Sequence, residues 1–335
     1  MVQISAGLDR QIVDLYRQIV SENIRQLPYD ASSRTAFGSW QRRARVRLKK
    51  ILGELPRERI GFGLQRKVVE DGPRYTMEHL QYWTRPGLQA VAYLLTPKGV
   101  TLPAPAILCL HGHSAGGKDE SIDPDSIYRG FGRTFAEAGC VVLCPEQIGF
   151  GERAFDDERV TYNVLVHGLN MVGHTLIGLR YWDLVRALDL LQEEPTVVKS
   201  RMGVMGLSLG GEMTLFLAAL QTRLRAACVG GYLSTHLHSF LDRPHCTCGH
   251  MRDLAKYFEH VDLAALIAPR PLFLDTGRKD KMFPVKDARD LVRQLRQVYD
   301  LFDRPEPHLG IHAHGGGHEI SCKRSVPWML QRLRD

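Results

Sequence analysis

The stretch Gly206-Leu207-Ser208-Leu209-Gly210-Gly211 decides the fold of this 335-residue chain more than any other. It follows the apolar run 202–205 and precedes the helix-forming run 212–220, so the order strand, tight turn, helix is predicted. A serine between glycines projects from such a turn, and the helix that begins at Leu209 directs its free N–H groups toward it. We therefore predict that Ser208 is a nucleophile. The alternative is a turn of small residues with an incidental serine.

The segments on either side of this turn alternate between short apolar runs and amphipathic helices. Strands are expected at residues 66–70, 75–83, 90–96, 106–110, 140–144, 203–207, 226–229, 271–274 and 309–312. Helices are expected at residues 131–138, 176–194, 210–220, 285–299 and 327–333. Turn signals at Asp71-Gly72-Pro73 and Pro86-Gly87 favour antiparallel pairing of the first three strands. The later alternation predicts an α/β fold with a mostly parallel sheet and helices on both faces.

A serine hydroxyl needs a base that takes its proton, and His318 is the candidate base. It follows the last expected strand in Gly315-Gly316-Gly317-His318, where a glycine-rich loop can place the imidazole at the sheet edge. A carboxylate must then orient the imidazole. Asp280, in the loop after strand 271–274, is preferred. Asp275 is the competitor because it lies closer to the end of that strand.

The oxyanion that forms on an attacked carbonyl needs fixed backbone donors. One is assigned to the amide of Leu209. The other is assigned to the amide of His113, with Ser114 as the close alternative, because His111-Gly112-His113-Ser114 follows the expected strand 106–110. The competing interpretation is that His111 and His113 bind a metal ion, but no carboxylates converge nearby in the sequence.

Three further residues are expected near a substrate. Glu146 and Arg153 follow strand 140–144 and so fall on the same sheet edge as Ser208. Arg153 either anchors an anionic substrate group or pairs with Glu152 or Glu146, and the pairing is favoured. His236 lies in the segment 230–250, which we expect to form part of the acyl or alcohol pocket, and residues 163–174 are expected in a lid or pocket wall.

The pattern Cys246-x-Cys248-x-His250 resembles a metal site because thiolate and imidazole suit zinc. Its spacing differs from the usual C-x2-C, so a loop with free cysteines and no metal is preferred over a structural zinc ion.

Two helices are expected before the sheet, at residues 8–24 and 34–52, the second ending at Gly53. We divide the chain into a helical extension, residues 1–60, and a catalytic domain, residues 61–335. The second helix carries the only dense basic run, which we interpret as a solvated face beside an apolar stripe rather than a nucleic-acid site. The apolar stripes of both helices must be buried, either against the sheet or in a homo-oligomer contact.

The amino-acid composition limits the classes of protein to which this chain can belong. The net charge is +7, and 44% of the residues are hydrophobic, which allows a full core and excludes disorder as the main state. No run is long and apolar enough for a membrane span, and Met1–Arg10 has no pattern of a signal peptide. Seven cysteines without scaffold-like spacing favour a reducing compartment, so a cytoplasmic location is expected.

The chain resembles bacterial esterases of the α/β-hydrolase superfamily, in the group related to acetyl xylan esterases and dienelactone hydrolases. The order Ser208, Asp280, His318 is the chain order of the α/β-hydrolase triad. The other matching segments are His111-Gly112-His113, Cys144-Pro145-Glu146, Gly149-Phe150-Gly151-Glu152-Arg153, Ala268-Pro269-Arg270-Pro271 and Gly317-His318-Glu319. Two departures from these relatives bear on the substrate. Dienelactone hydrolases usually carry a cysteine where Ser208 stands in this chain. Acetyl xylan deacetylases usually carry a glutamine where Leu209 stands.

The resemblance implies an eight-stranded, mostly parallel sheet and a serine carboxylester hydrolase that needs no cofactor. It also implies short acyl esters, including acetylated sugars, as small-molecule substrates. The alternatives are a serine peptidase or amidase, since the same triad cleaves amides, and a binding protein that has kept a hydrolase pocket.

Overall fold

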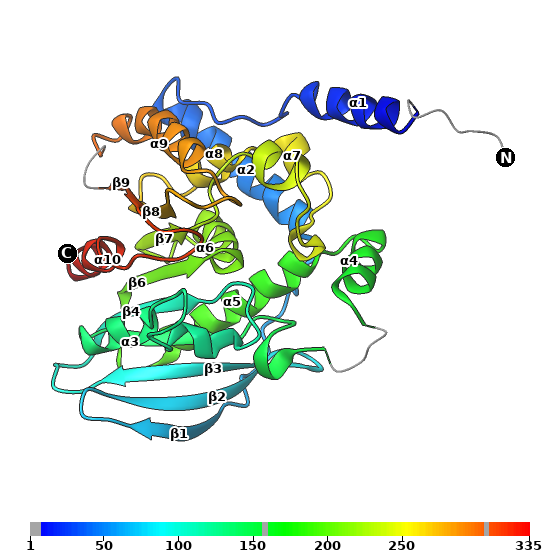
Figure 1. Cartoon of the computed structure of the whole chain (residues 1–335). Coiled ribbons are helices and arrows are strands. Elements are labelled where there is room, and N and C mark those ends of the chain that lie inside the picture. Colours follow the sequence, from blue (N-terminus) through cyan, green and yellow to red (C-terminus); the bar gives the residue numbers. More distant parts are fainter. Residues whose placement is uncertain (1–7, 156–159, 305–307) are drawn as a thin grey trace.

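A twisted sheet of nine strands runs through the described residues, 8–155, 160–304 and 308–335, of this computed structural model (Figure 1). The strand order is β1-β2-β3-β5-β4-β6-β7-β8-β9. The strands are β1 (Gln65–Asp71), β2 (Tyr75–Arg85), β3 (Leu88–Pro97), β4 (Ala104–Leu110), β5 (Val141–Pro145), β6 (Val197–Leu207), β7 (Ala226–Gly230), β8 (Leu272–Gly277) and β9 (Leu309–His314).

The sheet is antiparallel at one end and parallel through the rest. β1, β2 and β3 form antiparallel pairs, and β3 also runs antiparallel to β5. From β5 through β4, β6, β7 and β8 to β9 every pair is parallel. The predicted α/β-hydrolase fold is confirmed, but the predicted count of eight strands is wrong. The additional edge strand is β1, which the turn after Asp71 folds back onto β2, with Gln65 opposite Gln81.

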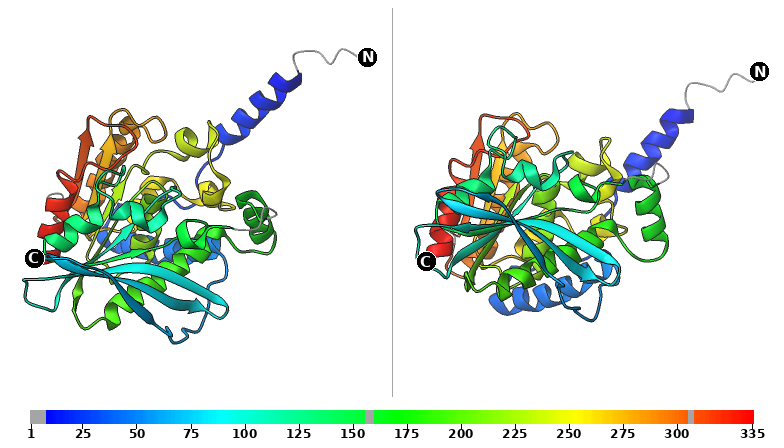
Figure 2. Two further views of the ribbon diagram at one scale, coloured as in Figure 1. Left: turned by 60° about the horizontal axis from the view of Figure 1, so that its bottom comes forward. Right: turned by 90° about the horizontal axis from the view of Figure 1, so that it is seen from below.

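Helices cover both faces of the sheet (Figure 2). The first hydrophobic cluster joins one face to α2, α5, α6, α8 and α9, and the second joins the opposite face to α3 and α10. The helices are α1 (Leu8–Ser21), α2 (Arg34–Leu52), α3 (Phe131–Glu137), α4 (Tyr162–Met171), α5 (Leu176–Glu193), α6 (Leu209–Leu220), α7 (Leu254–Tyr257), α8 (His260–Ala265), α9 (Val285–Asp300) and α10 (Ser325–Arg334).

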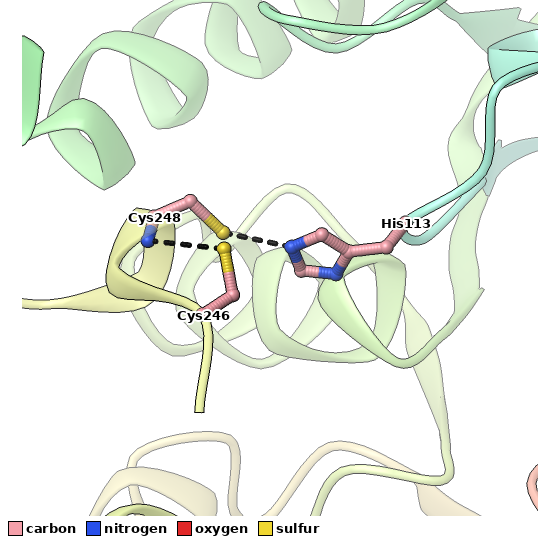
Figure 3. A group of neighbouring side chains, drawn as sticks. All are labelled: His113, Cys246 and Cys248. Atoms are coloured by element: carbon pink, nitrogen blue, oxygen red, sulfur yellow. Dashed lines mark hydrogen bonds between the residues drawn. The ribbon is translucent and has the colours of Figure 1, made fainter. Parts of the chain in front are cut away.

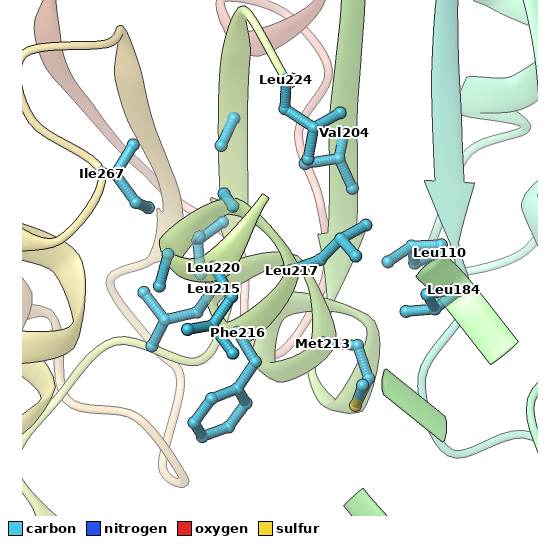
Figure 4. Packing of buried hydrophobic residues seen from close by; sticks show 14 of the residues in the cluster. Leu110, Leu184, Val204, Met213, Leu215, Phe216, Leu217, Leu220, Leu224 and Ile267 are labelled. Carbon is cyan, nitrogen blue, oxygen red and sulfur yellow. The ribbon is translucent and has the colours of Figure 1, made fainter. Parts of the chain in front are cut away.

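Helix α6, which follows Ser208, lies in the middle of the larger cluster. All of its residues are buried, and Leu215, Phe216 and Leu217 are fully covered by the neighbouring sheet and helices (Figure 4). Burying one such side chain stabilises the fold by about 1.5–3 kcal/mol. The helix that starts at the candidate nucleophile is therefore held rigidly from every side.

The two N-terminal helices differ in their packing. Helix α2 ends at Leu52 with Gly53 as its C-cap, as predicted, and the Ser33 side chain caps its N-terminus. It buries Phe37, Trp40 and Leu48 in the same core as the sheet. Its basic residues line the more exposed side, although Arg45 donates hydrogen bonds to the carbonyl groups of Ala219 and Leu266.

Helix α1 projects away from the body of the molecule (Figures 1 and 2). The apolar side chains of Ile12, Leu15 and Ile19 are 57–68% exposed. One contact back to the body is the hydrogen bond from the Tyr16 hydroxyl to the Leu241 carbonyl, 2.5 Å.

Across the described ranges, no helix combines the length and the hydrophobicity that a membrane crossing requires. Residues 1–7, on which the expectation about a signal peptide largely depends, lie outside them.

Candidate active site

Ser208 occupies the turn between β6 and α6, in a backbone conformation that side chains rarely adopt. Its φ is 59° and its ψ is −123°, and such strain persists only where the surroundings impose it. The flanking glycines explain how the turn fits. A Cβ on Gly206 would lie 2.3 Å from the Gly210 carbonyl oxygen, and one on Gly210 would lie 2.0 Å from the Leu110 carbonyl oxygen. The turn therefore requires glycine at both positions.

His318 and Asp280 form a direct pair. The distance from His318 Nδ1 to Asp280 Oδ2 is 2.8 Å, and the Asp280 side chain is buried. The other carboxylate oxygen of Asp280 accepts hydrogen bonds from the amides of Met282, 2.8 Å, and Phe283, 3.1 Å. The carboxylate is thus fixed by backbone donors while it holds the imidazole.

The loops that carry this pair are joined to each other by backbone contacts. The Lys279 amide donates to the Gly316 carbonyl, 2.9 Å, and the Arg278 amide donates to the His314 carbonyl, 2.8 Å. A Cβ on Gly277 would lie 1.9 Å from the Gly317 carbonyl oxygen, so the close approach of the two loops depends on this glycine.

Asp275, the competing carboxylate, lies in a different environment. It is fully buried in β8, and the Ser325 hydroxyl donates to it at 2.5 Å. Its closest imidazoles are those of His312, 3.5 Å, and His314, 3.6 Å. Burial raises the pKa of the Asp275 carboxyl. The structure therefore places Asp280, and not Asp275, against His318.

Ser208 and His318 both lie beside the residues at the end of β7. The Ser208 amide donates to the Gly230 carbonyl, 3.1 Å. The His318 ring lies beside the next residue, because a Cβ on Gly231 would be 3.3 Å from His318 Cε1. On its other side the His318 ring stacks on Phe283, with 5.7 Å between ring centroids and 25° between planes. The sequence pattern gave no indication of this aromatic support.

The two predicted oxyanion donors belong to Leu209, which follows Ser208 in the chain, and to His113, in the loop that passes close to Ser208. As the first residue of α6, Leu209 has an N–H group with no acceptor within its helix. The loop after β4 passes Ser208 so closely that a Cβ on Gly112 would lie 2.9 Å from Ser208 Cβ. This loop is fixed by a hydrogen bond from the Gly112 amide to the Tyr128 hydroxyl, 2.7 Å, and His113 is the next residue.

The two histidines of the His111-Gly112-His113 segment have separate partners. The ring of His111 is fully buried, and its two nitrogens lie 2.8 Å from the Gly112 carbonyl oxygen and 3.0 Å from the Gln147 amide. Nε2 of His113 instead lies 2.8 Å from Cys248 Sγ. His111 is therefore occupied by these backbone groups and by the Glu146 carboxylate, 3.2 Å from its Nε2, and the geometry does not support a metal site built from His111 and His113.

Glu146 differs from the expectation of a substrate contact. Its side chain is completely buried and accepts hydrogen bonds from the Lys118 amide, 2.7 Å, and from Lys118 Nζ, 3.1 Å. Burial alone would raise the pKa of Glu146, but the hydrogen bonds and charges of His111 and Lys118 hold it below the usual range. The structure thus assigns this carboxylate to the support of the loops behind the site. The sequence does not show which buried lysine will meet it.

Arg153 forms the stabilising pair that was favoured, but with a different partner. Its guanidinium lies 2.8 Å from an Asp183 carboxylate oxygen on α5 and donates to the Glu146 carbonyl at 3.0 Å. The predicted pairing with the carboxylates of Glu152 or Glu146 is therefore replaced by one with Asp183.

His236 is buried and lines a cavity together with Tyr232, Phe240, His250 and Met251, and Ser208, Asp280 and His318 are not among its lining residues. Its amide donates to Glu259 at 2.9 Å, and burial lowers the pKa of its imidazole. Tyr232 connects this cavity to the His318 region, since its ring lies 5.4 Å from that of Phe283. Several residues of the segment 230–250 thus line a cavity, and the role of this segment in an acyl or alcohol pocket stays a prediction.

Glu212, on the first turn of α6, is a buried acidic residue that sequence reasoning did not single out. It is 3% exposed, and its Oε1 has no hydrogen-bond partner in the described part of the chain. Burial raises the pKa of Glu212 to about 8, and the Arg180 charge offsets only part of this effect. A lone Glu after Gly-Gly carries no sequence signal that would reveal its burial.

The fold, with a serine on a strained strand-to-helix turn and a His–Asp pair at the same edge, defines an α/β-hydrolase. The sequence matches the model of the Abhydrolase family over residues 17–315, and the chain belongs to that family. A relative in Bacillus subtilis (strain 168), "Putative hydrolase YtaP", is 29% identical over 265 residues, which are 76% of this chain and 86% of that protein.

Two solved structures with this fold are esterases by description. One is a "putative acetyl xylan esterase" from Bacteroides fragilis NCTC 9343, with a TM-score of 0.79, 19% identity and coverage of 96% of this chain and 94% of that one. Another is a glucuronoyl esterase from Solibacter usitatus, with a TM-score of 0.67, 17% identity and coverage of 93% and 98%. Both identities are below 20%, so these likenesses show a shared α/β-hydrolase fold, while the family match and the relative in Bacillus subtilis place the chain among the hydrolases of that family.

Proposed function

We propose that this protein is a serine carboxylester hydrolase that acts through Ser208, His318 and Asp280. The observation that carries the proposal is the juxtaposition of a strained serine turn with the 2.8 Å His318–Asp280 pair at the end of β7. The strained backbone at Ser208 and the buried carboxylate that faces the imidazole both support this assignment.

In the proposed reaction Ser208 Oγ attacks the ester carbonyl carbon while His318 takes the hydroxyl proton through Nε2. Asp280 accepts the hydrogen bond from Nδ1 and stabilises the imidazolium. The amides of Leu209 and His113 donate to the oxyanion. His318 then returns the proton to the departing alcohol, and a water molecule that His318 deprotonates releases the acid from Ser208.

We further propose short-chain acyl esters of carbohydrates as the substrate class. Support comes from the descriptions of the structural neighbours, which include an acetyl xylan esterase and glucuronoyl esterases. In the protein itself, His236 and Tyr232 line a small cavity, and the Tyr232 ring contacts Phe283, on which His318 stacks. We propose that this cavity takes a short substituent rather than a long acyl chain.

The test is hydrolysis of 4-nitrophenyl esters from acetate to decanoate, of acetylated xylo-oligosaccharides, of methyl glucuronate and of a peptide anilide. We expect the highest kcat/KM for acetyl esters, and Ser208→Ala should lower it by roughly 10³–10⁶-fold. Faster cleavage of the anilide would favour a peptidase. No turnover of any substrate by the wild-type protein would favour a binding protein and contradict the proposal.

A further inference from the structure

Three side chains from two distant segments converge beside the catalytic edge (Figure 3). His113 lies in the loop after β4, and Cys246 and Cys248 lie 133 and 135 residues later, around a short 3-10 helix (Thr247–Gly249). One ring nitrogen of His113 and the two sulfur atoms all lie within 4.8 Å of one another. We refer to His113, Cys246 and Cys248 as the thiol–imidazole cluster.

The contacts within the thiol–imidazole cluster are direct. His113 Nε2 lies 2.8 Å from Cys248 Sγ, and the Cys248 amide donates to Cys246 Sγ at 3.4 Å. Cys248 is 1% exposed, and neither cysteine is part of a disulfide. Figure 3 shows the two sulfur atoms next to each other, with the His113 ring facing them.

These three donors form a set that suits a thiophilic divalent ion. Thiolate and imidazole favour zinc over the hard cations, which prefer oxygen ligands. With metal–sulfur distances of about 2.3 Å and metal–nitrogen distances of about 2.0–2.1 Å, tetrahedral ligand atoms lie roughly 3.5–3.8 Å apart. In the observed group every pair of donor atoms lies within 4.8 Å, which is close to this spacing.

The sequence pattern points to the wrong histidine. Cys246-x-Cys248-x-His250 suggests His250 as the third ligand, but His250 is exposed and is not part of the group that converges. The structure supplies His113 instead, from the loop that passes Ser208. The thiol–imidazole cluster therefore joins the loop 111–114 to the segment 245–250. A motif confined to residues 246–250 would make no such connection.

We propose that His113, Cys246 and Cys248 bind one zinc-class divalent ion, with the fourth coordination position left to a water molecule. The ion fastens the segment 245–250 to the loop 111–114. A consequence that rests on the proposed function is that the bound ion steadies the His113 amide as an oxyanion donor. Metal binding itself does not depend on that function.

The experiment measures metal uptake without any substrate. Protein purified under reducing conditions is stripped with a chelator and titrated with Zn²⁺ against a chromophoric competitor, and with Co²⁺ by visible absorption. We expect one equivalent per chain and a thiolate-to-cobalt charge-transfer band. Cys246→Ser, Cys248→Ser and His113→Ala should lose the saturable binding, whereas His250→Ala and Cys322→Ser should keep it.

The metal titration of the wild-type protein tests the proposal by itself, so the test does not depend on whether the variants fold. Absence of both saturable Zn²⁺ uptake and the charge-transfer band would overturn it. An intact mass that shows a disulfide between Cys246 and Cys248 in protein isolated under reducing conditions would overturn it as well. Retention of the metal by Ser208→Ala is expected, which separates this proposal from the proposed ester hydrolysis.

Discussion

Replacing Glu212 by Gln is expected to change how stability depends on pH. The carboxyl group is buried under the nucleophile turn, and its pKa is raised from 4.5 to about 8 by burial. The folded protein therefore keeps this proton between pH 4.5 and 8, while the unfolded chain releases it. Because the folded state binds more protons over this range, the free energy of unfolding falls as pH rises toward 8.

The size of the effect follows from the same two values. A difference of one pH unit in pKa corresponds to about 1.4 kcal/mol, so the loss from pH 4.5 to above pH 8 is on the order of 5 kcal/mol. Gln cannot ionise, and its stability should not show this loss. Near pH 5 the two proteins should be similar, because Gln resembles the protonated Glu212.

The assay is denaturant unfolding followed by circular dichroism, at several pH values between 5 and 9. The difference in free energy between Glu212→Gln and wild type should grow with pH by several kcal/mol in favour of the variant. Glu137→Gln, at an exposed glutamate on α3, is the matched control and should give a nearly constant difference. A constant difference for Glu212→Gln as well would refute the reasoning.

Three further substitutions test the site and its supports. Asp280→Asn should lower kcat for an acetyl ester by about 10⁴-fold, since the imidazole loses the partner that sets its tautomer. If Asp275→Asn shows this loss of kcat and Asp280→Asn stays near wild type, the catalytic carboxylate is Asp275 instead. Gly112→Ala places a Cβ 2.6 Å from the Leu207 carbonyl oxygen and 2.9 Å from Ser208 Cβ. We expect a lower kcat while the far-ultraviolet circular dichroism spectrum stays like that of wild type. Unchanged steady-state kinetics would contradict the predicted crowding. Lys118→Met leaves the buried Glu146 carboxylate without its cation and should lower the free energy of unfolding by about 3–5 kcal/mol; urea melts that superimpose on those of wild type would show that this ion pair is dispensable.

The sequence predicted those parts of the fold that depend on local pattern. Every expected strand appears in the sheet, and the helix expected at 34–52 has the same bounds in the structure. Apolar runs, turn glycines and the Gly53 cap act within a few residues, so their signals are readable in one sequence. The edge strand β1 was located, but the resemblance to relatives with eight strands gave the wrong total.

The parts that escaped prediction depend on contacts between distant segments. The pattern around position 146 suggested a substrate contact, but the structure buries that carboxylate against Lys118, 28 residues earlier. In the same way, no local signal indicates that Arg153 will meet Asp183 or that His113 will meet Cys248. These side-chain contacts form between segments that are far apart in the sequence and come together only in the folded sheet.

The most direct test of the account is covalent labelling with an alkyl phosphonate ester, followed by peptide mass mapping. Because such a reagent mimics the tetrahedral intermediate, we predict one adduct per chain, located on Ser208, with esterase activity lost in the same proportion. Ser208→Ala should take no label, and His318→Ala should take it much more slowly. The central claim would be contradicted if the reagent abolished esterase activity while labelling a residue other than Ser208. It would also be contradicted if protein labelled on Ser208 kept its full esterase activity.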